Sequence, residues 1–317
     1  MNPDHSHRPS PAAILVVPLV VALILTLFAW PSARLEPRDL PIGVAGPDAA
    51  VAPLERRLAA QEGAFEPKRY AGPAAARTAI EDREVYGAFV AGPAGVRGLT
   101  SSAASPAVAQ LLGHAAAEAG GNAAVVDVVP AGEHGTALGS SVLPLVIAGV
   151  LTGIVASLLT ASGWGRAGVV TAISVLTGLG ATAIIQSWLG VIEGGWLANA
   201  AALSLTVLAI GAFVAGLYAL LGVKGAGIAA ALMVLIGNPF SGVASAPELL
   251  PQPVGLIGQL MPPGAGANLV RSTGYFDGAG AGDHVAVLAV WALVGLAALG
   301  AAALRRHRST VAAPAAA

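Results

Sequence analysis

Long runs of apolar residues constrain this chain more than any other feature, because a helix needs about 20 of them to cross a hydrocarbon core of roughly 30 Å. Five uninterrupted runs qualify, at residues 12–30, 142–162, 167–189, 197–221 and 285–304. A hydrophobic content of 56% with 10% charged residues also lies outside the range of soluble proteins. We therefore predict an α-helical polytopic membrane protein.

A sixth run, residues 225–246, qualifies only if its helix tolerates Pro239. We predict a kinked helix there, which gives six transmembrane helices, five of them in a membrane domain of residues 141–304. The first run is longer than the roughly 7 to 15 apolar residues of a signal peptide and ends in Trp30 and Pro31. We expect a retained anchor, with cleavage as the alternative.

Basic residues in short loops predict the orientation, because the cytoplasmic side carries the excess of lysine and arginine. With six crossings, one side holds Arg8, Arg166, Lys224, Arg305, Arg306 and Arg308. The other side holds Glu193, Glu248, Asp277 and Asp283, with Arg271 as its one base beyond the large loop. Both termini, residues 1–11 and 305–317, are therefore expected to be cytoplasmic tails.

Residues 31–140, between the first two runs, differ from the rest because they hold nine bases and twelve acids. Short β-type runs at 41–46, 65–71, 85–92 and 123–129 alternate with helical patterns at 52–61, 73–84 and 105–120. Ser105 and Pro106 are typical of a helix start. These features predict an extracytoplasmic α/β domain between helices 1 and 2.

We expect this domain to bind or dock rather than to catalyse. His114 and His134 stand at no metal-ligand spacing, the chain has no cysteine, and no G-x-S-x-G motif is present. We interpret Glu81 to Glu84 as the solvated end of a helix. We expect no enzyme activity, no metal, no cofactor and no nucleic-acid partner. We expect the chain to lie in a lipid bilayer.

A proline-rich segment interrupts the apolar pattern before the last run. Pro239 disfavours helix at Asn238, and residues 254–261 are apolar but too short to cross. Irregular backbone at membrane depth is tolerated only where protein buries it or water reaches it. We predict an outer re-entrant segment at residues 247–271; a rigid external loop is the alternative.

Polar side chains are sparse within the predicted spans. Gln186 and Asn199 are expected to form hydrogen bonds between helices. No charged residue lies near the centre of a span, which argues against a carrier that relays protons or sodium. Gly149 with Gly153, and Ser174 with Gly178, are small-residue pairs that favour close helix packing.

Three stretches carry a resemblance to a known family: "LPIGVAGPD" after the first run, "AIEDREVYGAFV" in the α/β domain, and "GNPFSG" with "APELLPQPVGLIGQLMPPGAGANLVRSTGYFDGAG" before the last run. Together with the order of spans, they resemble the ABC-2 type transporter permeases. The closest branch is that of the YhgE/Pip (phage infection protein)-like membrane proteins. The resemblance covers nearly the whole chain.

The resemblance implies a permease subunit in a bacterial cytoplasmic membrane, working as a homodimer or heterodimer that exports an amphipathic or polymeric substrate. The segment from Asn238 to Arg271 then corresponds to outer re-entrant helices that close the exit. Glu248 and Arg271 either form an ion pair across that lid or are both solvated loop charges. The residues expected at the lid or translocation path are Gln186, Asn199, Asn238, Pro239, Phe240, Gly242, Glu248, Gln259 and Arg271.

Two features bear on ATP. The chain lacks a G-x-x-x-x-G-K-[ST] loop, so ATP hydrolysis would require a separate ATP-binding subunit. The inner loop "GWGR" is short for the coupling helix that such permeases use. A second hypothesis is therefore a non-transporting envelope protein whose external domain binds a ligand or partner, as a phage receptor or cell-wall assembly factor does.

Overall fold

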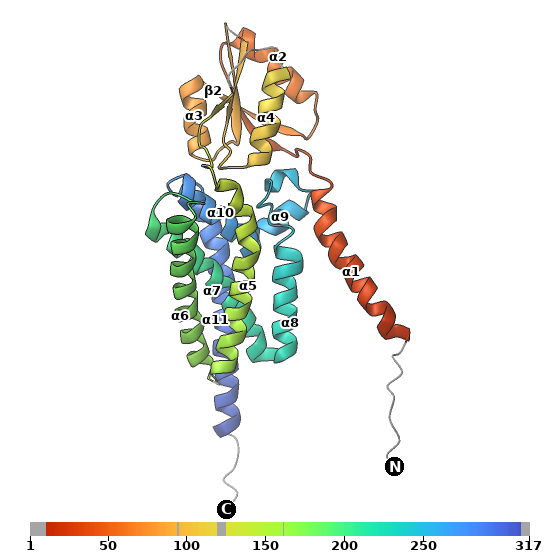
Figure 1. The fold of residues 1–317 in the computed structure, drawn as a ribbon, viewed down its shortest axis with the longest axis vertical. Helices are drawn as coiled ribbons and strands as arrows, with labels where there is room; N and C mark the ends of the chain where they lie inside the picture. The colour runs from red at the N-terminus through yellow and green to blue at the C-terminus, as the bar shows by residue number, and fades with distance from the viewer. Residues whose placement is uncertain (1–10, 94, 119–124, 161, 312–317) are drawn as a thin grey trace, which may run out of the picture.

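The computed structural model describes residues 11–311 except 94, 119–124 and 161. An α/β domain stands at one end of a bundle of long helices, and the beginning of α1 and the end of α11 lie toward the opposite end (Figure 1). Within the described residues, five helical segments are long and apolar enough to cross a membrane. This arrangement is that of a helical polytopic membrane protein.

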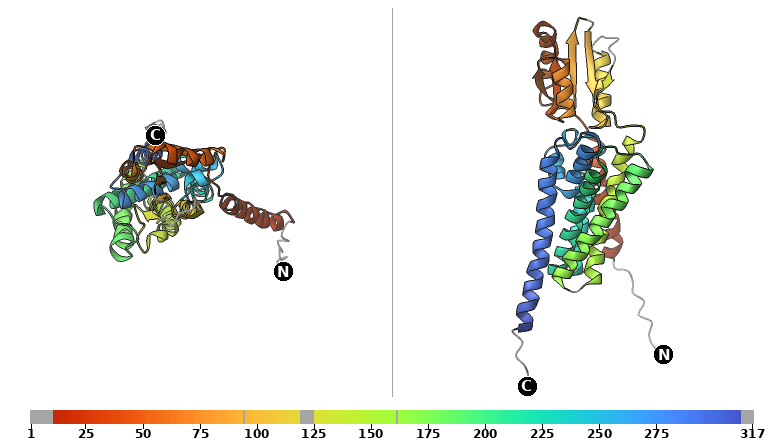
Figure 2. Two further views of the ribbon diagram at one scale, coloured as in Figure 1. Left: turned by 90° about the horizontal axis from the view of Figure 1, so that it is seen from above. Right: turned by 90° about the vertical axis from the view of Figure 1, so that its left-hand side faces the viewer.

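Helix α1 (Pro11–Ser32) confirms a helix at the first apolar run but stands apart from the bundle. It diverges from the other helices in two views, meeting them only near the α/β domain (Figures 1 and 2). Leu15, Val17 and Leu19 are 63%, 65% and 68% exposed. Such a helix suits a lipid environment, because its apolar side chains have little protein to cover them.

The α/β domain contains a five-stranded sheet in the order β2-β1-β3-β4-β5. All neighbouring strands are parallel except β3 and β4, which are antiparallel. The strands are β1 (Leu40–Ala45), β2 (Phe65–Tyr70), β3 (Gly87–Gly92), β4 (Gly95–Thr100) and β5 (Val126–Asp127). The helices are α2 (Asp48–Ala59), α3 (Pro73–Glu81) and α4 (Pro106–Glu118).

Alternate residues of β1 make the core of this domain. Leu40, Ile42 and Val44 are fully buried on the face that α2 and α4 cover. Ala45 and Ala88 belong to the opposite face, which packs on α3 through Ile80. The two-residue period of a strand thus gives one sheet with helices on both faces.

Most elements of this domain match their predicted positions, with two differences. Helix α2 begins at Asp48, four residues before the predicted start, and β4 was not assigned from the sequence. The described part of the last strand is only Val126–Asp127; residues 119–124 lie outside the described residues. Ser105 caps α4 as expected, since its Oγ accepts from the Val108 N–H at 3.2 Å.

Helix α7 (Trp196–Leu221) is the centre of the bundle, and α5, α6, α8, α10 and α11 all pack against it. Around it stand α5 (Leu138–Leu159), α6 (Gly163–Thr182), which continues into the π-helix η2 (Ala183–Trp188), and α11 (Ala281–Val311). Helix α5 follows the 3-10 turn η1 (Gly135–Ala137). The central position of α7 explains why 13 of its 26 residues are buried.

The small-residue pairs are sites of close helix packing, as expected. A Cβ added to Gly153 would lie 2.6 Å from the Gly211 carbonyl oxygen of α7. A Cβ added to Gly178 would lie 2.1 Å from Ser204 Oγ and 2.6 Å from Ser204 N, also in α7. Glycine at these positions lets α5 and α6 approach α7 to backbone distance.

The predicted kinked span at residues 225–246 is wrong in its second half. Helix α8 (Val223–Ala231) passes into the π-helix η3 (Leu232–Gly237), and the helix ends there, one residue before Asn238. Pro239 lacks an N–H and disfavours helix at the residue before it, so the helix stops instead of bending. The remaining apolar helix, Val223–Gly237, is shorter than the five candidate spans.

Residues 238–275, which we name the cap segment, lie between the bundle and the α/β domain. They contain the 3-10 turn η4 (Pro247–Leu249), α9 (Val254–Gln259) and α10 (Pro262–Tyr275). Helix α9 has six residues and α10 has fourteen, so neither is long enough to cross a bilayer. Residues 262–272 of α10 are all buried, which places this short helix inside protein.

Candidate functional site

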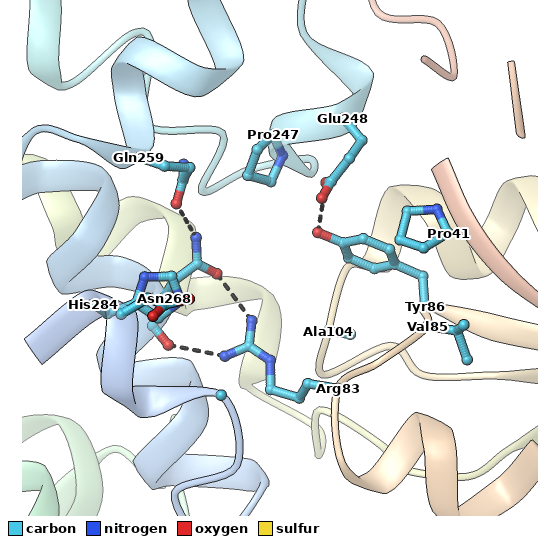
Figure 3. A pocket seen from close by; sticks show the side chains of 12 residues that line it. Pro41, Arg83, Val85, Tyr86, Ala104, Pro247, Glu248, Gln259, Asn268 and His284 are labelled. Carbon is cyan, nitrogen blue, oxygen red and sulfur yellow. Dashed lines mark hydrogen bonds between the residues drawn. The ribbon is translucent and has the colours of Figure 1, made fainter. Parts of the chain in front are cut away.

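The most elaborate polar contacts of the described chain lie where the α/β domain meets the cap segment, which we name the junction. The loop between α3 and β3 contributes Arg83 and Tyr86, and α10 contributes Asn268, Arg271 and Ser272. Figure 3 shows Arg83 directed toward Asn268 on one wall of a cavity, and Tyr86 directed toward Glu248 on the other.

Arg83 extends from the α/β domain onto α10. It follows α3 with φ of 61°, a left-handed conformation that ends the helix and turns the chain. Its Nη1 donates to the Asn268 carbonyl at 3.1 Å and to Ser272 Oγ, and its Nη2 donates to Asn268 Oδ1 at 3.1 Å. The guanidinium also lies 5.2 Å from the centre of the Phe276 ring.

Desolvation lowers the pKa of Arg83 below its ordinary value, while Tyr86 and Glu248 act in the opposite direction. The guanidinium nevertheless keeps its charge, because arginine does not deprotonate in proteins. The α/β domain therefore holds the cap segment with a cation bound to neutral oxygens of Asn268 and Ser272.

Arg271 is 3% exposed and reaches the same amide from within α10. Its Nη1 donates to Asn268 Oδ1 at 3.0 Å, and its Nη2 donates to the Val243 carbonyl at 3.0 Å. Its buried Nε has no hydrogen-bond partner among the residues that the structure describes. Two guanidinium groups, from the α/β domain and from the cap segment, thus share one neutral acceptor.

The amide of Asn268 is held in place by a chain of further bonds. Its Nδ2 donates to Gln259 Oε1 at 2.6 Å, and Gln259 Nε2 donates to the Ser241 carbonyl at 2.8 Å. This chain connects α10, α9 and the turn after η3. With Nδ2 committed to Gln259, Asn268 Oδ1 faces the two arginines as an acceptor.

Tyr86 makes the second contact between the α/β domain and the cap segment. Its hydroxyl donates to Glu248 Oε2 at 2.7 Å. Burial, and then the Glu248 carboxylate, raise the pKa of Tyr86 well above its usual value. The phenol therefore stays protonated and serves as a donor. The expected pair of Glu248 with Arg271 does not form, because each has the different partners described above.

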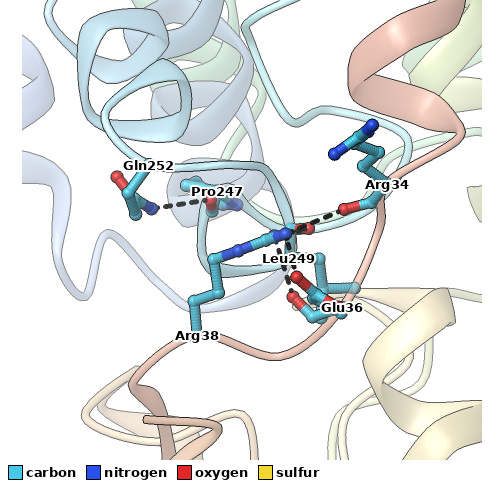
Figure 4. A network of polar contacts seen from close by, with 6 residues as sticks. All are labelled: Arg34, Glu36, Arg38, Pro247, Leu249 and Gln252. Atoms are coloured by element: carbon cyan, nitrogen blue, oxygen red, sulfur yellow. Dashed lines mark hydrogen bonds and ion pairs between the residues drawn. The ribbon is translucent and has the colours of Figure 1, made fainter.

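Backbone bonds and the Arg38 side chain form the third contact, and Figure 4 shows the Arg38 side chain reaching Leu249 and Glu36. The N–H groups of Glu36 and Arg38 donate to the carbonyls of Leu249 and Glu248 at 3.1 and 3.0 Å. The Arg38 side chain adds a bond from Nη1 to the Leu249 carbonyl at 2.9 Å and an ion pair with Glu36. The connection between α1 and β1 is therefore bound to η4.

Two cavities open at the junction. The Arg83 cavity, of about 290 Å³, is lined by the Arg83 guanidinium, the His284 imidazole and the carboxylates of Glu248 and Asp283, among other residues. The Arg271 cavity, of about 260 Å³, lies among five segments: the loop before α4, the connection between β5 and α5 that contains η1, the start of α5, the cap segment before η4, and α10. Its polar lining includes Ser102, Thr136, Ser140, Arg271 and Tyr275.

The residues predicted for the lid or path divide into three groups. Glu248, Gln259 and Arg271 meet at the junction. Asn238 to Gly242 form the turn after η3, where Ser241 Oγ donates to the Asn238 carbonyl at 2.7 Å and Gly242 has φ of 66°. This group includes Pro239 and Phe240. A Cβ added to Gly258 of α9 would lie 1.6 Å from the Phe240 carbonyl oxygen, so α9 lies directly against this turn.

Gln186 and Asn199 form the third group and lie at the connection between η2 and α7. Asn199 Nδ2 donates to Gln186 Oε1 at 3.0 Å and to the Glu193 carbonyl at 2.6 Å. Gln186 Nε2 in turn donates to the Gly194 carbonyl at 2.9 Å. The expected hydrogen bond between the two helical segments is confirmed, and it joins η2 to the first turn of α7.

Sequence reasoning missed Arg83, Tyr86 and Asn268. Arg83 stands in "EDRE", whose charge density is typical of a solvated surface. A usable signal existed in α10, because Asn268, Arg271 and Ser272 are spaced at i, i+3 and i+4 and so share one helix face. Polar residues on one face of an otherwise apolar helix indicate a polar partner.

The junction offers hydrogen-bond donors and positive charge, a chemistry that holds carbonyls, carboxylates and phosphates. The described residues contain no group of three or more His, Cys, Asp or Glu placed to hold a metal ion. No family model, no curated protein and no solved structure matches the chain.

Proposed function

We propose that this chain is the permease-like membrane subunit of an ABC-2 type exporter, which moves an amphipathic or polymeric substrate out of the cell past the cap segment. In this proposal the α8–η3 helix is the sixth crossing, both termini are cytoplasmic, and the α/β domain lies outside. Its supports are the order of elements, with an α/β domain after the first apolar helix, and a helix break before the last one.

One observation carries the proposal: the α/β domain is bound to the cap segment at three points. Arg83 contacts α10, Tyr86 contacts Glu248, and the chain after α1 pairs with η4. The cap segment contains the two short helices that the proposal assigns to the exit. Movement of the α/β domain would therefore move the lid of the exit.

The first test is purification of the full chain from its own host membrane in a mild detergent. An export complex predicts a stoichiometric ATP-binding subunit, identified by mass spectrometry, and a class of compound that is missing outside a deletion strain and is restored by the gene. If neither the subunit nor the compound is found in repeated preparations, the exporter proposal fails.

Loosening one docking contact tests the role of the lid. Tyr86→Phe removes the hydroxyl that donates across the junction to Glu248 Oε2 at 2.7 Å. Tyr70→Phe is the matched control, because the Tyr70 hydroxyl donates to Glu84 within the α/β domain. Export should fall in Tyr86→Phe and not in Tyr70→Phe at equal abundance in the membrane; equal export in the two variants contradicts the lid role.

A second candidate function is a non-transporting envelope protein whose α/β domain binds a ligand or partner. It is favoured by the short connections at the end of the bundle away from that domain: α5 ends at Leu159 and α6 begins at Gly163, while Gly222 alone separates α7 from α8. Little chain remains there for an ATP-binding subunit. Repeated purification without such a subunit, with an extracellular partner present, would select this candidate.

A further inference from the structure

Two arginines of the junction form no direct ion pair within the described part of the chain. Arg83 and Arg271 both donate to Asn268 Oδ1, at 3.1 and 3.0 Å, and their other hydrogen-bond acceptors are carbonyl or hydroxyl oxygens. Among the described residues, no carboxylate lies within the 4.0 Å of an ion pair from either guanidinium. Glu248, at the same junction, accepts from Tyr86.

Such an arrangement is unusual because buried charges in proteins are paired. Arg271 is 97% removed from solvent, remains charged, and has its Nε unbonded within the described part of the chain. A second cation on the same acceptor adds repulsion that a neutral amide only partly offsets. Within the described residues, Arg271 therefore offers a positive charge and an unbonded Nε–H to an anion.

The two cavities differ in their suitability for that anion. The carboxylates of Glu248 and Asp283 line the Arg83 cavity and would repel it. The described residues that line the Arg271 cavity include no carboxylate, and they add the hydroxyl of Thr136 to Arg271. Its volume of about 260 Å³ accommodates one phosphate or carboxylate group with a few attached atoms.

We propose that the Arg271 cavity binds an oxyanion, the phosphate or carboxylate group of a small solute or a lipid headgroup. The guanidinium of Arg271 is the charge that holds it. Because the cavity lies among the α/β domain, the start of α5 and the cap segment, a bound oxyanion joins all three and stabilises the docked domain. This inference does not depend on export, since it concerns binding alone.

The test uses the purified full chain in a nonionic detergent and a phosphate-free chloride buffer. The unfolding temperature is measured against inorganic phosphate at constant ionic strength, and separately against micelles containing phosphatidic acid or phosphatidylcholine. We expect a saturable rise of about 3 °C or more with phosphate or with phosphatidic acid. Response to phosphate identifies a soluble oxyanion, and response to phosphatidic acid alone identifies a lipid headgroup. No response to either overturns the proposal.

Variants locate the site. Arg271→Gln should abolish the rise, whereas Arg97→Gln, at an exposed arginine of β4, should leave it unchanged. Because Arg271→Gln also removes hydrogen bonds to Asn268 and Val243, a second pair changes the exposed Thr136. Thr136→Glu supplies a carboxylate to the cavity, so it should raise the unfolding temperature without ligand and abolish the phosphate or phosphatidic acid response. Thr136→Gln should do neither, and a full response in Thr136→Glu would overturn the assigned location.

Discussion

Asn268 gives the sharpest test of whether Arg83 and Arg271 lack a negative partner, because two nearly isosteric changes should alter the stability of the protein in opposite directions. Asn268→Asp replaces the shared amide oxygen by a carboxylate, whereas Asn268→Leu removes it. The Asn268 Oδ1 accepts from Arg83 at 3.1 Å and from Arg271 at 3.0 Å, and the side chain is 4% exposed. A carboxylate there would turn two neutral-acceptor bonds into two ion pairs.

The magnitudes follow from these contacts. A unit charge pair about 4 Å apart gains roughly 4 kcal/mol at an effective dielectric constant of 20, before desolvation of the new carboxylate offsets most of it. Asn268→Asp also loses the bond from Nδ2 to Gln259, which costs about 1 kcal/mol. We expect a net stabilisation of about 1 to 2 kcal/mol for Asn268→Asp, and a loss of about 3 to 5 kcal/mol for Asn268→Leu.

The assay combines thermal unfolding of the full chain in detergent with amide hydrogen exchange. The N–H groups of Glu36 and Arg38 report docking directly, because they donate across the junction to Leu249 and Glu248. Their exchange should slow in Asn268→Asp and accelerate in Asn268→Leu, while amides of β1 stay protected in both. If Asn268→Asp destabilises the protein as much as Asn268→Leu does, the two arginines do not lack an anion and the reasoning is refuted.

Two further predictions concern other contacts. Tyr86→Phe should lower the free energy of unfolding by about 1.5 to 3 kcal/mol, because the hydroxyl donates to a carboxylate. Because the folded-state pKa of Tyr86 is raised, its contribution to the free energy of unfolding is complete below the ordinary tyrosine pKa of about 10 and falls as the pH rises above it. Urea titrations at several pH values should therefore show a smaller loss of stability at alkaline pH in Tyr86→Phe than in the unaltered protein. Gly178→Ala should destabilise the protein by about 1 to 3 kcal/mol, because its Cβ would lie 2.1 Å from Ser204 Oγ. Gly180→Ala is the matched control, with nothing within 4 Å of its added Cβ, and equal unfolding temperatures for the two variants would contradict the packing argument.

Local patterns predicted most elements of this fold. A short β-type run indicated β1, and Ser105 with Pro106 indicated the start of α4. Strand β4 escaped prediction because "GVRGLT" has two glycines and no clear alternation; its antiparallel pairing with β3 supplies what the sequence pattern lacks. The helix of residues 225–246 was predicted too long because hydropathy alone does not reveal whether Pro239 bends a helix or ends it.

The junction was only partly predictable for a different reason. The prolines and apolar composition of the cap segment indicated a special structure there, and Glu248, Gln259 and Arg271 do meet at the junction. Arg83 lies 185 residues from its acceptor Asn268, so no local pattern relates the two. A charged residue before a strand looks solvated until the fold brings a polar helix face against it.

The isolation of α1 has a mechanical consequence. The α/β domain is inserted between α1, which diverges from the other helices, and α5, which is packed on α7. Both ends of the domain thus continue into apolar helices. Helix α5 packs on α7, whereas α1 has few protein neighbours. If the domain rotates about its connection to α5, it moves the end of α1 to which it is joined. A rotation at one end of the molecule would then displace the whole of α1 sideways.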